Sequence, residues 1–306
     1  MDGGKLRIIC GPTAAGKSRV AFQLAERYGG AIISADSRQV YRGFNVGTAK
    51  PSRSETRIVD HYGIDVAEPK ERYSAARWAA DARTWIDEVR SKNKTAVVVG
   101  GTGLYIRALV EPLFVAPQLD PAKRAVLETQ LATLPLSELR RWCETLDPAR
   151  ARLGRTQLQR AIETALLSGK QLSELHAQAN IEANARAMPA RYLVVDPAAA
   201  LQTRIAERVD WMLEHGWADE VSDLSGRVPP DAPAWKASGY AVMRAFAEGE
   251  IDLSSARERV IIETRQYAKR QRTWFRHQLP EAAVTRVNPD DPEFGAVVRD
   301  WWEKAE

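Results

Sequence analysis

The sequence contains one pattern with a well-defined chemistry, a glycine-rich loop that ends in a lysine and a serine. The loop fits G-x4-G-K-[ST]; it follows the apolar residues 6–10 and precedes residues 18–27, which favour a helix. Its members are Gly11, Pro12, Thr13, Ala14, Ala15, Gly16, Lys17 and Ser18. The loop N–H groups and the helix N-terminus would bind phosphate oxygens, Lys17 would add a positive charge, and Ser18 would ligate Mg²⁺. The pattern predicts a P-loop for a ligand with at least two phosphates.

A carboxylate follows the next predicted strand. Residues 31–34 are mostly apolar, and Asp36 opens a polar segment that continues through Gln39 to residues 47–51. Ligands of parallel α/β sheets bind outside the carboxyl ends of the strands, so Asp36 lies near the P-loop if the two strands are neighbours. The alternative is that Asp36 caps the N-terminus of a helix. We favour a functional Asp36 because the polar residues continue well past it.

A third predicted strand also ends in unusual residues. Residues 95–99 form an apolar run typical of a buried parallel strand, and Gly-Gly-Thr-Gly follows at residues 100–103. The glycines around Thr102 indicate a backbone that approaches a ligand or another segment closely. No aspartate ends this strand, so the carboxylate of an ordinary Walker-B motif is missing. Residues 73–90 have helical periodicity and should form the crossover helix before the strand.

Length and composition restrict the class of protein. The chain has 306 residues, a net charge of +4 and 44% hydrophobic residues, which suits a globular protein with room for an extra subdomain. The first predicted strand starts at residue 6, which leaves no space for a signal peptide, and no apolar stretch approaches the roughly 20 residues of a membrane span. The two cysteines, Cys10 and Cys143, indicate neither a disulfide framework nor a zinc site. We expect a cytoplasmic protein that does not bind membranes.

The order of the predicted elements defines the fold class and the domains. Strand signals stop after about residue 112, and amphipathic helical segments follow at residues 122–133, 136–146, 156–168 and 172–180. A strand returns at residues 192–196. The sequence therefore predicts an α/β protein with a P-loop NTPase-like parallel sheet, flanking helices and an inserted all-helical subdomain. The predicted domains are a catalytic core of residues 1–112 and 192–306 and a helical insertion of residues 113–191.

The C-terminal part carries many positive charges on predicted helices. Arg204 and Arg208 are four residues apart in the helix predicted for residues 198–215, so they share one face. This pair could clamp an anion over the P-loop or could pair with surface carboxylates, and both interpretations remain open. Residues 256–278 combine arginines and lysines with aromatic residues, a composition that suits RNA. The alternative is an amphipathic helix whose aromatic side chains pack on the core.

These motifs, in this order, resemble those of the bacterial tRNA dimethylallyltransferases over nearly the whole chain. Besides the P-loop, the resemblance rests on residues 34–43 (SADSRQVYRG), 47–51 (GTAKP), 100–105 (GGTGLY), 159–163 (QRAIE), 204–209 and 264–276. It implies transfer of the dimethylallyl group from dimethylallyl diphosphate to the 6-amino group of an adenosine, with Mg²⁺ and with release of diphosphate. The implied target is adenosine 37, next to the anticodon, in tRNAs that read codons starting with U.

The resemblance also implies roles for individual residues. Asp36 would be the general base that takes the proton of the amine. Lys17, the loop amides, Mg²⁺ bound by Ser18, and Arg204 would stabilise the departing diphosphate. Thr102, the last of the implied catalytic residues, would line the channel in which donor and adenosine meet. The residues implied to contact tRNA are Asp36, Ser37, Arg38, Gln39, Thr102, Arg124, Gln159, Arg160, Ala161, Ile162 and Glu163. The insertion would hold the anticodon stem-loop, and we expect a monomer.

The chain departs from the family pattern at several positions, and other functions remain as alternatives. Gly154 and Gln157 stand where the family has an Asp-x-x-Arg stretch, and residues 61–63 read His-Tyr-Gly instead of His-His-Leu. A P-loop small-molecule kinase would leave the insertion and the basic helix without a role. An isopentenyltransferase acting on free adenine nucleotides would generally lack an insertion of this size. A non-catalytic RNA-binding protein would not need Asp36.

Overall fold

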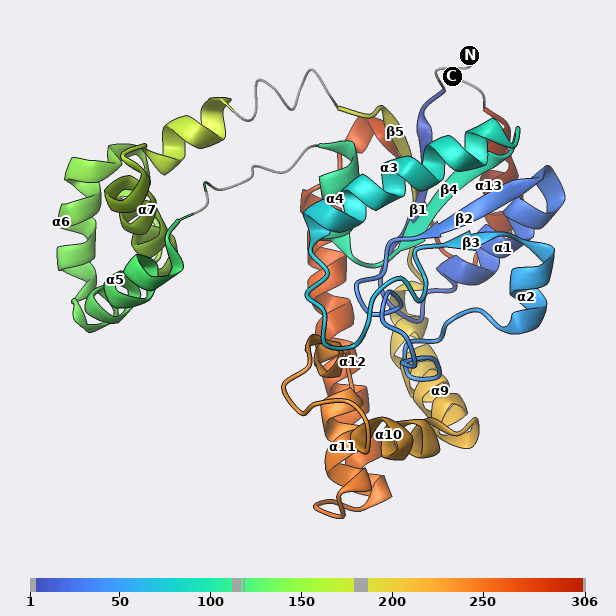
Figure 1. The fold of residues 1–306 in the computed structure, drawn as a ribbon. Helices are drawn as coiled ribbons and strands as arrows, with labels where there is room; N and C mark the ends of the chain where they lie inside the picture. The colour runs from blue at the N-terminus through green and yellow to red at the C-terminus, as the bar shows by residue number, and fades with distance from the viewer. Residues whose placement is uncertain (1–3, 112–116, 118, 179–186, 305–306) are drawn as a thin grey trace. The chain divides into compact units, whose positions relative to one another are not determined.

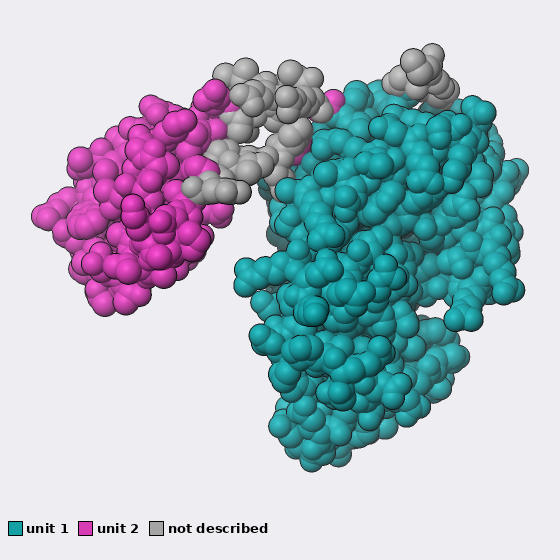
Figure 2. Space-filling model, viewed as in Figure 1, with its two compact units in different colours: residues 1–110, 188–306 teal, residues 111–187 magenta. Residues whose placement is uncertain are grey.

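The computed structural model describes residues 4–111, 117, 119–178 and 187–304 (Figure 1). The chain forms two compact units: unit 1 comprises Met1–Val110 and Met188–Glu306, and unit 2 comprises Glu111–Ala187 (Figure 2). The expected domain boundary between residues 112 and 113, and the expected helix end at residue 180, lie outside the described residues. The other expected boundary, between residues 191 and 192, falls inside a strand that begins at Ala190.

Unit 1 is built on a six-stranded sheet in the order β3-β2-β4-β1-β5-β6, in which all neighbours run parallel. The strands are β1 Leu6–Cys10, β2 Gly30–Ser34, β3 His61–Tyr62, β4 Thr95–Gly100, β5 Ala190–Val195 and β6 Val284–Val287. β1 lies near the centre, where Ile8 pairs with Val98 of β4 and with Tyr192 of β5. The apolar runs at residues 6–10 and 95–99 therefore form adjacent buried strands, and the predicted parallel α/β fold is confirmed.

Several helices of unit 1 pack around this sheet. They are α1 Lys17–Tyr28, α2 Arg53–Ile58, α3 Ala75–Ser91, α4 Gly103–Val110 and α13 Phe294–Glu303. Buried side chains of α1 and α13 share one apolar cluster with residues of β1, β2, β4 and β5. α3 and α4 contact each other and β4, and they cross in front of the sheet in Figure 1. Trp78 of α3 donates a hydrogen bond to the carbonyl of Ser34 (2.9 Å), which fixes the predicted crossover helix to the end of β2.

A group of helices extends unit 1 beyond the carboxyl ends of the strands (Figure 1). It consists of α9 Leu201–Glu214, α10 Trp217–Ser225, α11 Tyr240–Ala247 and α12 Leu253–His277. Short 3-10 helices of unit 1 lie at Ala198–Ala200, Pro233–Lys236 and Glu281–Ala283, and another lies at Pro148–Arg150 in unit 2. The ring of Tyr240 contacts those of Phe44 and Trp217, with centroids 4.8 and 5.5 Å apart, so the loop after β2 is packed against α10 and α11. None of the helices formed by the described residues has the length and hydropathy needed to cross a bilayer.

Unit 2 is helical throughout its described part. Its helices are α5 Pro121–Thr133, α6 Leu136–Leu146 and α7 Arg155–Ser168, and residues 172–178 are also helical. Asp120 caps the N-terminus of α5, and its carboxylate accepts hydrogen bonds from the N–H groups of Ala122 and Lys123. The core contains the buried residues Leu131, Leu139, Cys143, Ala151, Leu158, Ala161, Ile162 and Leu172. Cys143 is thus a core residue, as its position on an amphipathic helix suggests.

Candidate active site

The predicted P-loop connects β1 to the N-terminus of α1, a 12-residue helix that begins at Lys17. Gly11 has a φ of +141°, and a Cβ at this position would lie 2.2 Å from the carbonyl oxygen of Val195, so only glycine fits. Gly16, in the left-handed region with a φ of +91°, turns the loop into the helix. The ammonium group of Lys17 donates a hydrogen bond to the carbonyl of Pro12 (2.6 Å), which folds the side chain over the loop.

The charge state of Lys17 depends on its surroundings. Burial lowers the pKa of the Lys17 amine from 10.5 to about 8, and the nearby positive charge of Arg208 acts in the same direction. The carboxylate of Asp36 partly opposes this shift. Lys17, Arg208 and Asp36 therefore form one electrostatically coupled group beside the P-loop.

Asp36 lies just after the end of β2, at the same edge of the sheet as the P-loop. The condition that β1 and β2 are neighbours is not met, because β4 lies between them. One of its carboxylate oxygens accepts a hydrogen bond from the N–H of Arg38 (2.8 Å), so Asp36 stabilises a turn. The residues after it are in turns, and no helix begins here, so the helix-cap alternative is wrong. The N–H of Ser37 donates to the hydroxyl of Thr102 (3.1 Å), which joins the loops after β2 and β4.

The side chain of Gln39 is used to hold the loop that follows β2. Its amide nitrogen donates to the carbonyls of Thr48 (3.1 Å) and Ala49 (3.0 Å), and its oxygen accepts from the hydroxyl of Ser34 (2.8 Å). Lys50 completes this arrangement with an ion pair to Asp65 (2.6 Å). These contacts hold residues 34–50 in one conformation next to the P-loop.

Gln271 connects three parts of the site, and this role could not be predicted from the sequence. Its side-chain oxygen accepts from the N–H of Thr13 (2.8 Å), and its amide nitrogen donates to the carbonyl of Gly101 (2.8 Å). Gln271 is buried, so both bonds are shielded from water. A lone glutamine in a basic helix gives no signal of its own. Only its place in the family motif at residues 264–276 could have drawn attention to it.

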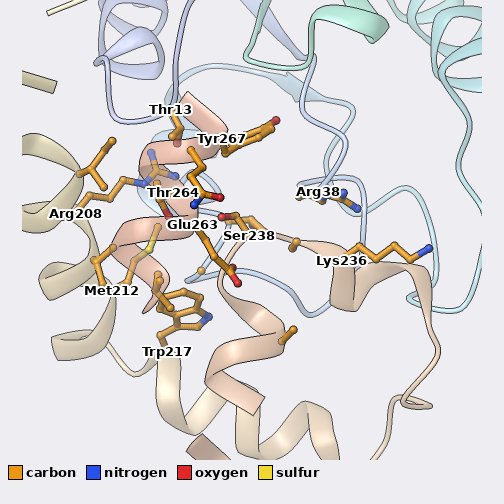
Figure 3. A pocket seen from close by; sticks show the side chains of 18 of the residues that line it. Thr13, Arg38, Arg208, Met212, Trp217, Lys236, Ser238, Glu263, Thr264 and Tyr267 are labelled. Atoms are coloured by element: carbon orange, nitrogen blue, oxygen red, sulfur yellow. The ribbon is translucent and has the colours of Figure 1, made fainter. Parts of the chain in front are cut away.

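Two cavities meet at this edge of the sheet. The smaller, of about 200 Å³, is polar and lies at the P-loop, where Gly16, Lys17 and Ser18 line it. The larger, of about 510 Å³, extends between the loop after β2 and helices α9 to α12 (Figure 3). The residues common to both linings are Thr13, Asp36, Thr48, Arg208 and Tyr267. A ligand can therefore place a phosphate group in one cavity and a different chemical group in the other.

The larger cavity has an apolar wall and a polar rim. The wall comprises the buried side chains of Ile205, Val209, Met212, Trp217 and Val260. The first three repeat along α9 at a spacing that keeps them on one face. The polar residues of the lining include Arg38, Lys236, Glu263 and Arg270. In Figure 3, Arg38 and Lys236 lie on the side of the cavity opposite Arg208 and Met212.

The two arginines of the expected clamp have different surroundings. Arg204 pairs with Asp290 and has a nitrogen 3.8 Å from the position of a Cβ on Gly16, but it lines neither cavity. Arg208 lines both cavities, and Figure 3 shows its side chain extending from α9 towards the side where Thr13 lies. Of this pair, only Arg208 therefore faces the space where a ligand fits, and Arg204 is paired with a carboxylate.

The P-loop can supply part of a metal site. Among the described residues there is no group of three or more histidine, cysteine or acidic side chains that could hold a metal ion. Mg²⁺ in P-loop proteins does not need such a group, because it is bound by few protein oxygens together with phosphates and water. Ser18, an exposed residue in the first turn of α1 that lines the smaller cavity, fits this kind of site.

The remaining expected site residues lie in unit 2. Arg124 of α5 forms ion pairs with Glu128 (2.8 Å) and with Glu163 of α7 (3.2 Å). These three residues line a cavity of about 500 Å³ within unit 2, together with Gln159 and Arg160. Ala161 and Ile162, by contrast, are fully buried in the apolar core of the unit. Their side chains are thus not available to a ligand at the surface.

The sheet is parallel, a P-loop follows its central strand β1, and Asp36 lies on the loop after β2. A polar cavity and a cavity with an apolar wall meet beside these residues. Together these features define a P-loop protein with a site for a phosphorylated ligand. The model of the IPP transferase family matches residues 39–278, so the chain belongs to this family. It is 42% identical to a tRNA dimethylallyltransferase of Gloeobacter violaceus, covering 91% of this chain and 93% of the relative. It is 43% identical to one of Bordetella petrii, covering 90% and 91%.

Solved structures agree with this assignment. The tRNA isopentenylpyrophosphate transferase of Bacillus halodurans is 32% identical, with a TM-score of 0.69 over 97% of this chain and 93% of that one. The enzyme of Staphylococcus epidermidis is 29% identical, with a TM-score of 0.67 over 96% of each chain. A eukaryotic dimethylallyltransferase acting on tRNA, at 24% identity and a TM-score of 0.76 over 92% of this chain and 73% of that one, shares the fold.

Proposed function

We propose that this protein transfers the dimethylallyl group from dimethylallyl diphosphate to the 6-amino group of an adenosine in tRNA and releases diphosphate. The pair of joined cavities carries this proposal. The polar cavity at the P-loop suits a diphosphate, and the apolar wall of Ile205, Val209 and Met212 suits a short branched hydrocarbon. Relatives at 42% and 43% identity are named tRNA dimethylallyltransferases, which supports the choice of donor and acceptor.

The reaction is a substitution at the first carbon of the prenyl group. The lone pair of the adenosine nitrogen forms the new bond to carbon, and the bond between this carbon and the diphosphate oxygen breaks. The electron pair of that bond stays on the oxygen, and the proton of the nitrogen passes to the carboxylate of Asp36. Asp36 lines both cavities, so it can reach a nucleophile that meets the donor where they join.

Positive groups around the P-loop stabilise the leaving diphosphate. The P-loop residues Ala14, Gly16, Lys17 and Ser18 line the smaller cavity, where the ammonium group of Lys17 would bind the diphosphate. Arg204, which lies beside Gly16 and is paired with Asp290, would add part of its charge. We assign Mg²⁺ as the metal, held at Ser18. When bound, Mg²⁺ would offset the negative charge of the diphosphate oxygens. Thr102 holds the N–H of Ser37 and so sets the path of the chain next to Asp36.

The tRNA would present its adenosine to the larger cavity. A base must leave the anticodon-loop stack to reach an enclosed site, and Arg38, Lys236 and Arg270 at the rim can bind the neighbouring phosphates. In unit 2, Arg124, Gln159, Arg160 and Glu163 form the second proposed contact, with the anticodon stem-loop. Adenosine 37 of tRNAs that read codons starting with U is the proposed target, in the cytoplasm and by a monomer.

The test is an incubation of the protein with labelled dimethylallyl diphosphate and Mg²⁺ in parallel with unmodified tRNA and with AMP. We expect label on tRNA, release of pyrophosphate and no label on AMP. Label on AMP alone would identify an enzyme that acts on free adenine nucleotides. Phosphate transfer from labelled ATP to a small alcohol, without prenyl transfer, would identify a kinase.

A further inference from the structure

Glu220 connects helix α10 to the loop after β2. One of its carboxylate oxygens accepts hydrogen bonds from the N–H groups of Asn45 (2.9 Å) and Val46 (2.8 Å). The other oxygen accepts a hydrogen bond from the hydroxyl of Tyr240 of α11 (2.5 Å). Burial raises the pKa of this hydroxyl, and the Glu220 carboxylate acts in the same direction, so Tyr240 remains a donor at neutral pH. A single side chain thus joins the loop to two helices.

The bonds from Glu220 hold the start of a tight turn at residues 46–49. The N–H of Ala49 donates to the carbonyl of Val46 (2.9 Å), which closes the turn. Ala49 has a φ of +49°, a left-handed conformation that is unfavourable for any residue with a side chain. Such a backbone persists only where the surrounding contacts hold it in place, and Glu220 supplies two of these contacts.

The 46–49 turn forms part of both cavities. Gly47 lines the larger cavity, Ala49 lines the smaller one, and Thr48 lines both. A Cβ at Gly47 would lie 2.1 Å from Nε1 of Trp217, so only glycine allows the turn to pack this closely on α10. The carbonyls of Thr48 and Ala49 also accept the hydrogen bonds of Gln39. Movement of the turn would therefore change the space where the two cavities meet.

We infer that Glu220 is a positioning residue, which holds the 46–49 turn as a fixed wall of the junction where the adenosine meets the prenyl donor. The inference rests on the proposed function. Neither Glu220 nor Tyr240 lines these two cavities, so Glu220 acts through the turn and not by direct contact with a substrate. The P-loop is held by other contacts, such as the bond between Gln271 and Thr13. Loss of Glu220 should thus disturb the alignment of the two substrates more than the binding of diphosphate.

The experiment compares Glu220→Ala and Glu220→Gln with the wild type and with two control variants of α10. The amide introduced by Glu220→Gln can keep the geometry, because its oxygen can accept from the two loop N–H groups and its nitrogen can donate to the Tyr240 hydroxyl. The first control, Val221→Ala, truncates a fully buried apolar side chain and destabilises the helix without removing a hydrogen bond. The second control, Asp219→Ala, removes an exposed carboxylate.

Two kinds of measurement separate positioning from stability. For each full-length variant, kcat and KM for dimethylallyl diphosphate are measured with tRNA at a temperature below all the melting transitions, and pyrophosphate binding is measured by calorimetry. Hydrogen exchange of a peptide that spans residues 43–50 reports on the N–H groups of Asn45 and Val46 without any need for activity.

We expect Glu220→Ala to lower kcat by about 10- to 10²-fold, because small misplacements of the substrates are costly. Pyrophosphate affinity and KM for the donor should stay within about threefold of the wild type, and exchange of the peptide should be at least about tenfold faster. Glu220→Gln, Asp219→Ala and Val221→Ala should keep kcat and exchange close to the wild type, although Val221→Ala should melt at a lower temperature.

Unchanged exchange in Glu220→Ala would overturn the inference, because the turn would then be held without the carboxylate. A kcat of Glu220→Ala within about threefold of the wild type would also overturn it. The same holds if Glu220→Gln is as impaired as Glu220→Ala, or if Val221→Ala loses as much activity, since charge or general stability would then matter. If the wild type transfers no prenyl group, the proposed function fails, and the exchange rates alone decide whether Glu220 holds the turn.

Discussion

Among the described residues, Asp36 is the only carboxylate that lines both cavities. It could be predicted from sequence, as could the P-loop, because each follows an apolar run that becomes a strand of the same sheet. By contrast, the sequence could not predict that Arg208 lines the cavities and Arg204 does not. Residues four apart share a helix face, and only the packing of α9 against α12 decides which of them reaches the cavity.

Replacing Asp36 by asparagine should abolish most of the chemistry and leave binding intact. The amide has nearly the same shape and can still accept the hydrogen bond from the N–H of Arg38, but it cannot take a proton. We expect kcat to fall by about 10²- to 10⁴-fold, with tRNA affinity within about twofold of the wild type. Asp60→Asn, at a carboxylate paired with Lys94 on the surface, is the control. Transfer by Asp36→Asn at a rate close to that of the wild type would exclude a general-base role.

Lys17 should make diphosphate binding depend on pH. Its amine has a pKa of about 8 in the free protein, and a bound diphosphate stabilises the charged form, so binding takes up a proton above this pH. Affinity for pyrophosphate should fall by up to about tenfold per pH unit above pH 8. Calorimetry between pH 7 and 10 measures this slope. Lys17→Arg stays charged over this range, so the part of the slope that comes from Lys17 should disappear. Equal slopes of affinity against pH in the two proteins would show that Lys17 is not the group that titrates.

The stability of the free protein should change in the opposite sense in the same pH range. The folded pKa of Lys17 lies below its ordinary value of 10.5, so between about pH 8 and 10.5 the unfolded chain binds more protons than the folded one. The contribution of Lys17 to the free energy of unfolding therefore rises with pH in this window. Urea denaturation of the wild type and of Lys17→Met at pH 7.5 and 9.5 would test this. The difference between the two proteins in the free energy of unfolding should be smaller at pH 9.5 than at pH 7.5.

At the scale of elements, α12 connects parts of the chain that are far apart in sequence. Two of its aromatic residues pack against the rest of the unit: Phe275 is buried, and the ring of Trp274 lies where a Cβ of Gly103 would be, 2.3 Å from the nearest ring atom. The third, Tyr267, lines both cavities. The core-packing alternative for residues 256–278 is therefore confirmed for the first two of these side chains. The sequence could predict this helix but not the contact of Gln271 with the P-loop, because that contact joins residues 258 positions apart.

Gln271→Glu should weaken both the fold and the site. The carboxylate loses the donor to the carbonyl of Gly101 and places two oxygens against each other in a buried position. We expect the free energy of unfolding to fall by about 1–3 kcal/mol, and kcat to fall because the P-loop and the turn after β4 lose their common partner. Thr273→Ala, at an exposed position of the same helix, should change neither. An unchanged urea midpoint in Gln271→Glu would show that this residue does not hold the P-loop.

At the scale of the whole molecule, unit 1 contains both cavities and unit 2 contains the other proposed tRNA contact. The end of the strand signals after about residue 112 allowed an insertion to be predicted from sequence. The burial of Ala161 and Ile162 could not be read from the family motif, since a motif does not show which face of α7 packs on the core. Exposed Arg160 is the clearest candidate for an RNA contact in this unit.

Arg160→Glu should affect tRNA without affecting the donor. Loss of a phosphate contact and the added negative charge should raise KM for tRNA by about tenfold or more at low salt and reduce the salt dependence of binding. Pyrophosphate binding in unit 1 should be unchanged. Arg141→Glu, at an exposed position of α6 in the same unit, is the matched control for charge. Equal tRNA affinities of these two variants and the wild type would place the RNA contact elsewhere.

The most direct test of the central claim is mass spectrometry of tRNA after incubation with dimethylallyl diphosphate and Mg²⁺. The wild type and Asp36→Asn are compared on unmodified bulk tRNA, and the products are digested to nucleosides and to mapped oligonucleotides. We predict that the wild type adds one dimethylallyl group to the adenosine that follows the anticodon, and that Asp36→Asn adds almost none. Unmodified tRNA in the wild-type reaction, or equal modification by the two proteins, would contradict an Asp36-dependent prenyl transfer to tRNA.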